Sequence, residues 1–416
     1  MRRGATHTVA PVSDPTTDIL LIGGGIASAS AAAELRENGF DGSILLVTRE
    51  MDAPYHRPPL TKGYLQGRED RAATLIRPEA WYAEHDVEVR TRTPVMDLDT
   101  TAKTAKLGRE QIGFGQALLA TGAGIRRLQV EGGMRDGIHY IRALGNADKL
   151  RNELADAQRV VVVGGSYIAT EVAASMVLLG KTVTLVMQEA LPLERGFGAA
   201  AGAFARDLLT SHGIEIVASA DVREFAGEGE GDGDARVDAV VCADGRRIDA
   251  GLVVVGVGAN PDVMLARKAK LELGESGGVR CDRTLRTCAD AIFAAGDMCE
   301  YDSVVHGRRL RIEHEEVAAA QGRHAARAML GSDEPYAEIP YFWSDLADWA
   351  TLEYVGAAAS WDEEIVRGDP ASGAFSVFYV QDGRVVGALS VGRGDDLDVA
   401  RELIAAGAGA QELPAP

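Results

Sequence analysis

The feature that most constrains this chain is a strand, glycine turn, helix and strand unit that occurs twice. The first copy, residues 18–50, has an apolar strand at 19–22, an alanine-rich helix and a second apolar strand at 44–47. The second copy starts with RVVVVGGSYIATE at residues 159–171 and continues into a strand at 182–187. A glycine turn before a helix N-terminus is suited to a dinucleotide pyrophosphate. One copy is a weak signal, but two predict an α/β protein with two nucleotide sites.

The residues of both turns have the sizes that this geometry needs. In the first turn Gly23 allows the tight bend, Gly25 lets the backbone approach a pyrophosphate, and small Ser28 permits close packing of helix on strand. In the second turn Gly164 and Ser166 stand where two glycines are more usual. Serine still leaves room for a phosphate, so the second site remains a prediction.

Length and charge exclude several classes of protein. The 416 residues predict two or three domains, and the net charge of −19 argues against nucleic acid and anionic membrane surfaces as partners. No apolar run approaches the length of a membrane span. Four cysteines in so long a chain do not form a disulfide framework, which favours a reducing cytoplasm.

The order of the patterns predicts where the domains begin and end. From Tyr336 onward the chain is richer in aromatic residues and in alternating strands, with Asp382-Gly383 as a hairpin turn and a closing helix at 397–406. The glycine and acid run at 226–234 is typical of a solvated hairpin loop. We expect a disordered tail (1–17), a discontinuous first nucleotide domain (18–125 and 248–335), a second nucleotide domain (126–247) and a small α+β domain (336–416).

Six short motifs occur in an order that resembles one family. They are PYHRPPLTK (54–62), LLATG (118–122), GGSYIATE (164–171), AAGD (294–297), RIEH (311–314) and FWSD (342–345). Together they resemble the FAD-dependent pyridine nucleotide-disulfide oxidoreductases, in the branch of ferredoxin reductases and apoptosis-inducing-factor-like flavoproteins. The resemblance implies two Rossmann-like domains, for FAD and NAD, and a small C-terminal α+β domain.

The resemblance also implies which residues hold the cofactors. The usual first ribose-binding acid is replaced here by Arg49, so that role moves to Glu50. The implied FAD residues are Gly23, Gly25, Ala27, Ser28, Glu50, Arg57, Lys62, Val95, Thr121, Arg142, Asp297, His314, Glu315 and Trp343. The implied nicotinamide nucleotide residues are Gly164, Ser166, Tyr167, Ile168, Glu171, Glu189 and Gly258. Glu189 favours NADH, while Arg195 leaves NADPH open through attraction to a 2′-phosphate.

Lys62 and Glu171 are the expected catalytic pair. A cation near the flavin stabilises negative charge on the reduced ring, and Glu171 at the start of the second helix orients the nicotinamide carboxamide. By residue type alone, a surface lysine and an ordinary helix glutamate are the more common explanations. Only the motif context reverses that preference.

Electrons then need an acceptor. Disulfide reductases of this fold carry a close cysteine pair beside the flavin, and neither glycine-turn helix contains one. The resemblance therefore implies an external ferredoxin-like iron–sulfur protein. The alternative is an apoptosis-inducing-factor-like, NADH-binding redox sensor with slow turnover and an NADH-dependent dimer.

Several other residues carry smaller expectations. Trp343 and Trp349 are candidates for an exit path, with buried packing the more common role for Trp349. Arg308, Arg309 and Arg311 are candidates for a basic docking patch. His324 is expected to be a solvated helix residue, and the histidine spacings predict no metal site.

Overall fold

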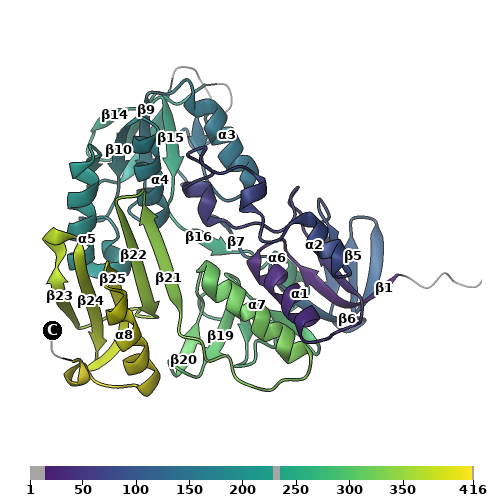
Figure 1. Ribbon diagram of the computed structural model, residues 1–416. Coiled ribbons are helices and arrows are strands. Elements are labelled where there is room, and N and C mark those ends of the chain that lie inside the picture. Colours follow the sequence, from purple (N-terminus) through teal and green to yellow (C-terminus); the bar gives the residue numbers. More distant parts are fainter. Residues whose placement is uncertain (1–14, 228–234, 415–416) are drawn as a thin grey trace, which may run out of the picture.

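The computed structural model describes residues 15–227 and 235–414 of the chain. Figure 1 shows three bodies: two built around sheets with flanking helices, and a third, drawn in yellow-green, built from the C-terminal strands. All three contribute residues to one large cleft. The predicted fold class, two Rossmann-like domains and a C-terminal α+β domain, is confirmed.

The first body contains a seven-stranded sheet in the order β3-β2-β1-β6-β5-β4, with β18 paired to the end of β6. Strands β3, β2, β1 and β6 pair in parallel, whereas β4, β5 and the start of β6 are antiparallel. The strands are β1 (Thr16–Ile22), β2 (Ile44–Val47), β3 (Val87–Arg90), β4 (Val95–Asp99), β5 (Thr104–Leu107), β6 (Glu110–Leu119) and β18 (Ile292–Ala294). A small sheet beside it comprises β17 (Val279–Cys281), β19 (Cys299–Ser303) and β20 (Arg308–Leu310). Its helices are α1 (Ile26–Glu37), α2 (Glu79–Glu84), α6 (Met264–Lys268) and α7 (Glu315–Met329).

Helices α1 and α7 pack closely because small residues meet at their contact. A Cβ added to Gly322 would lie 2.1 Å from the Ala27 carbonyl oxygen, so only glycine fits there. The alanine-rich sequence of α1 has the same effect from the other side. This contact brings the N-terminus of α7 beside the first glycine turn.

The second body contains a parallel five-stranded sheet in the order β11-β10-β9-β15-β8. Its strands are β8 (Ile138–His139), β9 (Arg159–Val163), β10 (Thr182–Val186), β11 (Glu215–Val217) and β15 (Leu252–Val255). Its helices are α3 (Leu144–Leu154), α4 (Tyr167–Leu178) and α5 (Glu194–Ser211). A three-stranded sheet of β12 (Val222–Ala226), β13 (Ala239–Cys242) and β14 (Arg247–Asp249) adjoins it. The two bodies are joined by the antiparallel pair β7 (Ala123–Ile125) and β16 (Ala259–Pro261).

Two of the predicted domain limits need correction. The boundary between residues 247 and 248 is wrong, because β15 pairs with β9 inside the second sheet and the chain leaves that sheet only after Val255. The predicted tail also ran too far, since Thr16 and Thr17 belong to β1, while residues 1–14 lie outside the described part. Residues 228–234 of the predicted acidic loop likewise lie outside it, although β12 and β13 on either side pair as a hairpin.

The third body is an antiparallel sheet in the order β21-β22-β25-β24-β23, packed against the closing helix α8. Its elements are β21 (Tyr341–Leu346), β22 (Ala350–Gly356), β23 (Glu363–Asp369), β24 (Ala374–Gln381), β25 (Arg384–Val391) and α8 (Gly394–Ala406). The predicted hairpin at Asp382-Gly383 is confirmed, with both residues at positive φ. Short 3-10 turns occur at Pro58–Thr61, Ala72–Thr74, Pro370–Ser372 and Ala410–Glu412.

Within residues 15–227 and 235–414, no helix combines the length and the apolar character needed to cross a bilayer.

Candidate active site

A cleft of about 720 Å³ lies where the three bodies meet. Seventeen of the twenty-one predicted cofactor residues lie on its wall. They are Gly23, Gly25, Ala27, Glu50, Arg57, Lys62, Val95, Thr121, Arg142, Tyr167, Ile168, Glu171, Gly258, Asp297, His314, Glu315 and Trp343. The other four, Ser28, Gly164, Ser166 and Glu189, lie outside that wall, although three of them belong to the second glycine turn and its surroundings.

The first glycine turn has the shape of a phosphate site. Gly23 has φ +128, and a Cβ there would lie 2.1 Å from the Ala120 carbonyl oxygen. Gly25 caps the N-terminus of α1, and a Cβ on it would meet no atom within 4 Å, so its backbone faces open cleft. Ser28 is fully buried beneath the turn, which fits its predicted packing role. The turn therefore presents helix amides to a space large enough for a dinucleotide.

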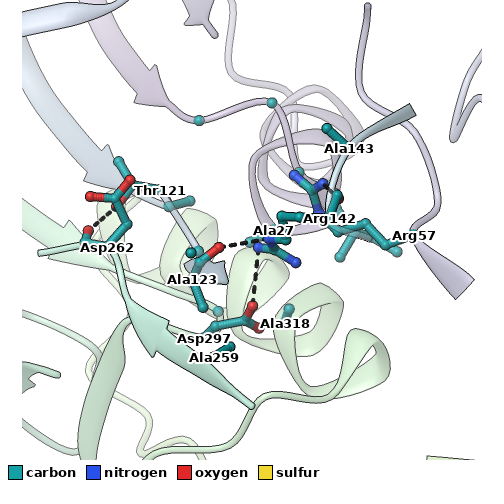
Figure 2. Close-up of a pocket in the computed structure, with 18 of the residues that line it drawn as sticks. Ala27, Arg57, Thr121, Ala123, Arg142, Ala143, Ala259, Asp262, Asp297 and Ala318 are labelled. Atoms are coloured by element: carbon teal, nitrogen blue, oxygen red, sulfur yellow. Dashed lines mark hydrogen bonds and ion pairs between the residues drawn. The ribbon is translucent and has the colours of Figure 1, made fainter. Parts of the chain in front are cut away.

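Two arginines converge on the cleft beside this turn (Figure 2). Arg142 donates hydrogen bonds to the Ala123 carbonyl at 2.6 Å and to Asp297 at 3.3 Å. Arg57 donates to the Arg142 carbonyl at 2.5 Å. Burial, and next the charge of Arg57, lower the pKa of the Arg142 guanidinium. Both guanidinium groups line the cleft, where their N–H donors suit an anionic ligand such as a pyrophosphate.

Glu50, the predicted ribose-binding acid, lies on the cleft wall. Both oxygens of Glu50 are engaged, one by Arg57 at 2.7 Å and the other by the Tyr55 hydroxyl. Burial alone would raise the pKa of Glu50, but Arg57 and Tyr55 outweigh it and hold that pKa below its usual range. Arg49 turns instead to Asp262, with a nitrogen to oxygen distance of 3.0 Å. Asp262, which the sequence did not indicate, therefore adds a further carboxylate to the cleft wall.

Lys62 and Glu171 form an ion pair, as expected from the motifs. The Lys62 ammonium lies 3.1 Å from Glu171 and 3.6 Å from Asp345 of the third body. Glu171 is 4% exposed, and it also accepts hydrogen bonds from Thr61 at 2.6 Å and Ser344 at 2.7 Å. These partners fix the carboxylate in one orientation at the cleft wall.

The N-terminus of α7 adds His314 and Glu315 to the cleft wall. Burial lowers the pKa of His314 to about 4, so the imidazole is neutral, and its ring lies 4.6 Å from that of Phe342. Glu315 pairs with His56 and accepts a hydrogen bond from the Arg57 amide at 3.2 Å. The Lys62 ammonium lies over the Trp343 ring, 5.8 Å from the ring centroid.

The His56–Glu315 pair predicts a pH effect on stability. The hydrogen bond to Glu315 raises the pKa of His56 in the folded state. The pair therefore stabilises the fold fully below the unfolded-state pKa and stops doing so as pH rises through the higher folded-state value. We expect the melting temperature of wild type to fall more than that of His56→Gln between about pH 6 and about pH 9. Equal falls in the two proteins would contradict this.

Residues 164–166 of the second glycine turn lie outside the cleft wall, and Tyr167, which follows them, lies on it. Gly164 has φ +127, a Cβ on it would lie 2.2 Å from the Gly256 oxygen, and the Ser166 hydroxyl donates to the same oxygen at 3.1 Å. Helix α4 runs from this turn to the cleft and places Tyr167, Ile168 and Glu171 on its wall. Helix α4 thus connects the second glycine turn, at its N-terminus, with the Lys62–Glu171 pair in the cleft.

Two minor expectations are wrong, and one is confirmed. His324 is buried at 5% exposure on the inner face of α7, not solvated. Arg309 pairs with Asp302 and Arg311 with Glu313, and Arg308 donates to the Ala357 carbonyl, so these arginines are not a free basic patch. Trp349 packs against the second body and stacks on His212 at 3.8 Å, which is the packing role.

In residues 15–227 and 235–414, no group of three or more His, Cys, Asp or Glu side chains is arranged to hold a metal ion. All four cysteines are free thiols. Cys281 and Cys299 are buried in neighbouring strands, outside the cleft wall as the described residues define it.

Four residues of the site were not predicted, and only some of them lie in a recognisable sequence pattern. Ser344 and Asp345 belong to the FWSD motif, and Thr61 to the proline-rich loop, so all three lay within patterns already noted. Their roles depend on the third body folding back onto α4, which no local pattern reveals. Asp262 follows β16 and has no local signature.

Known proteins resemble the chain over nearly its whole length. Residues 17–322 match the model of the pyridine nucleotide-disulphide oxidoreductase family, and residues 341–413 match a reductase C-terminal domain. The chain is 36% identical to the ferredoxin–NAD(+) reductase component of the anthranilate 1,2-dioxygenase system of Burkholderia cepacia, over 94% of each chain. It is 33% identical to rhodocoxin reductase of Rhodococcus erythropolis, over 93% of this chain and 89% of the relative.

Solved structures agree with these relatives. A ferredoxin reductase from Rhodopseudomonas palustris superposes with a TM-score of 0.89 at 32% identity, covering 94% of this chain and 95% of the other. The covalent complex of putidaredoxin reductase with putidaredoxin gives a TM-score of 0.87 at 32% identity, covering 94% of each chain. The chain therefore belongs to the pyridine nucleotide-disulphide oxidoreductase family.

Proposed function

We propose that this protein is an FAD-dependent NAD(P)H reductase that passes electrons to a ferredoxin-type iron–sulfur protein of an oxygenase or P450 system. The carrying observation is the single cleft that connects the first glycine turn with the Lys62–Glu171 pair at the helix of the second turn. The ferredoxin reductases among its relatives, and the neighbour solved with putidaredoxin, support this acceptor class.

The cleft residues around the first glycine turn fit FAD. Open space at Gly25 and the adjoining Arg57 and Arg142 suit its pyrophosphate, while Asp297 adds a carboxylate beside them. Bound FAD would supply a ring that accepts a hydride and releases electrons singly. Predicted contacts of Val95, Thr121, His314 and Trp343 with the bound cofactor are part of this proposal.

The chain's own residues prepare the site for that chemistry. Lys62 holds a positive charge in a partly buried position, where it acts more strongly than it would in water. Glu171, fixed by Thr61 and Ser344, offers an acceptor of fixed orientation to an amide group. Tyr167 and Phe342, whose ring centroids are 4.7 Å apart, cover this part of the cleft with apolar surface and limit access of water.

Steady-state assays test the proposal. The purified protein should be yellow, and NADH should drive reduction of cytochrome c only when a [2Fe–2S] ferredoxin is added. The apoptosis-inducing-factor-like alternative predicts slow turnover and a long-lived complex with NADH. It also predicts a dimer that forms on NADH addition, which size-exclusion chromatography would detect. A colourless protein that binds no FAD would contradict both.

NADH is the proposed electron donor, and Glu189 is the residue that would favour NADH over NADPH. Its carboxylate lies over the second glycine turn, where a Cβ on Gly165 would be 2.8 Å from Oε2, and it approaches Arg195 at 3.6 Å. A 2′-phosphate at this place would meet a like charge.

We expect Glu189→Gln to lower the ratio of kcat/KM for NADH over NADPH by about 10-fold, because the substitution keeps the size and removes the charge. Glu215→Gln, at an exposed glutamate on β11, serves as a control that should leave this ratio unchanged. A wild-type protein that prefers NADPH would contradict the assignment.

The cytoplasm is the proposed compartment, consistent with four cysteines that are all free thiols.

A further inference from the structure

Helix α5 of the second body is broken near its start. Gly198 has φ 75 and ψ −170 in the middle of a helical run, so the chain leaves helical geometry there and resumes it at once. The break divides a first turn, which begins at Glu194, from a longer helix that begins at Ala199. The amides of Ala199 and Ala200 therefore have no partners in the preceding turn and need acceptors from elsewhere.

Glu364 of the third body supplies those acceptors. Its Oε1 accepts from the Ala199 amide at 3.1 Å and its Oε2 from the Ala200 amide at 3.2 Å. The Trp361 indole donates to the same Oε1 at 3.1 Å. A Cβ on Gly198 would lie 1.9 Å from that oxygen, so glycine is required for the contact. A carboxylate that receives helix amides is a strong, charge-assisted cap.

A second contact from the third body holds the other side of the break. The Tyr379 hydroxyl donates to the Phe197 carbonyl at 2.7 Å, and this hydroxyl bond is buried. Figure 1 shows α5 beside β23 and β24, the strands that carry Glu364 and Tyr379. We call Trp361, Glu364 and Tyr379, with their bonds to residues 197–200, the α5 clasp.

The segment held by the clasp leads directly to the second nucleotide turn. Leu193 has φ 64, a strained value for a branched residue, and its amide donates to the Gly165 carbonyl at 2.8 Å. Leu193 is buried against the third body, and Arg195 approaches Glu189. Residues 189–198 are thus fixed at one end by the glycine turn and at the other by the clasp.

We propose that Glu364 is a positioning residue for the nicotinamide nucleotide. It holds the start of α5 so that residues 189–195 form one wall of the adenosine end of the second nucleotide site. This inference rests on the proposed function, because it takes the second glycine turn as an NADH site. It assigns the third body a part in NADH affinity, separate from the contacts of Ser344 and Asp345 with the catalytic pair.

Binding of NAD+ to the FAD-loaded protein, followed by calorimetry, tests this inference together with steady-state kinetics. In Glu364→Ala we expect the dissociation constant for NAD+ and the KM for NADH to rise about 10-fold, with kcat and FAD content within about 2-fold of wild type. Glu364→Gln, which keeps one acceptor oxygen, should give an intermediate rise. Glu363→Ala is the matched control. Glu363 is adjacent to Glu364 but exposed, so this variant should bind NAD+ as wild type does.

Each outcome decides one question. A lower melting temperature with unchanged NAD+ affinity in Glu364→Ala would reduce the clasp to a structural contact and overturn the inference. If Glu364→Ala does not fold, Trp361→Phe removes one donor to Glu364 while keeping an aromatic ring, and unchanged NAD+ affinity in both that variant and Glu364→Gln would overturn it equally. Failure of the wild-type holoprotein to bind NAD+ would instead contradict the proposed function.

Discussion

Replacement of Lys62 by methionine is expected to slow reduction of the bound flavin by NADH about 100-fold. Lys62 brings a positive charge to within 3.1 Å of Glu171 on the cleft wall. Methionine keeps much of the side-chain volume but leaves the nearly buried Glu171 carboxylate with only the hydroxyls of Thr61 and Ser344. The cleft then lacks the cation that would stabilise charge arriving on the cofactor.

Anaerobic stopped-flow absorbance measures this rate directly, separate from any effect on the acceptor. Lys149→Met is the control, because Lys149 is an exposed lysine paired with Glu153 on α3. Since Lys62 and Glu171 act as a pair, Lys62→Met combined with Glu171→Gln should cost less than the sum of the two single changes. A Lys62→Met protein with normal FAD content and a wild-type reduction rate would exclude the catalytic role.

The two alanine variants of the first glycine turn are expected to fail for different reasons. Gly23→Ala would place a Cβ 2.1 Å from the Ala120 oxygen at φ +128, so we expect a loss of about 3 kcal/mol or more of folding stability. Gly25 has φ −102, which alanine adopts freely, and its added Cβ would meet no atom within 4 Å. Gly25→Ala should therefore fold as well as wild type.

The open space at Gly25 is where the backbone would approach the FAD pyrophosphate. We expect Gly25→Ala to weaken FAD binding at least about 10-fold while leaving the melting temperature of the apoprotein unchanged. Titration of apoprotein with FAD, followed by quenching of flavin fluorescence, gives the affinity. Equal FAD affinity in Gly25→Ala and wild type would mean that the first turn does not bind the pyrophosphate.

Much of the fold could be predicted because its signals are local. Each glycine turn is specified by a few adjacent residues, and the strands beside it are continuous apolar runs, as buried parallel strands must be. The hairpin at Asp382-Gly383 has the same local character. The wrong boundary at residue 247 arose because β15 joins the second sheet by pairing with β9 and β8, strands that precede it by about ninety residues or more.

Site residues could be predicted where they belong to short motifs. They could not be predicted where they depend on contacts between segments far apart in the sequence. Lys62 and Glu171 were named from two motifs, and the structure brings them together. His324 was misassigned because helical spacing does not say whether a polar residue on the inner face is covered by a neighbouring helix. The pairing of Arg49 with Asp262, and the bonds of Glu364 to α5, join residues 164 or more positions apart, so the periodicity of the sequence does not indicate them.

The most direct test of the central claim is an anaerobic double-mixing experiment on the FAD-loaded protein. The first mix adds one equivalent of NADH, and the second adds an oxidised [2Fe–2S] ferredoxin, with the flavin and iron–sulfur absorbance bands followed together. We predict that the flavin band bleaches within the first mix and recovers as the ferredoxin band is lost. A flavin that NADH does not bleach, or a bleached flavin that ferredoxins from dioxygenase and P450 systems fail to reoxidise, would contradict the account.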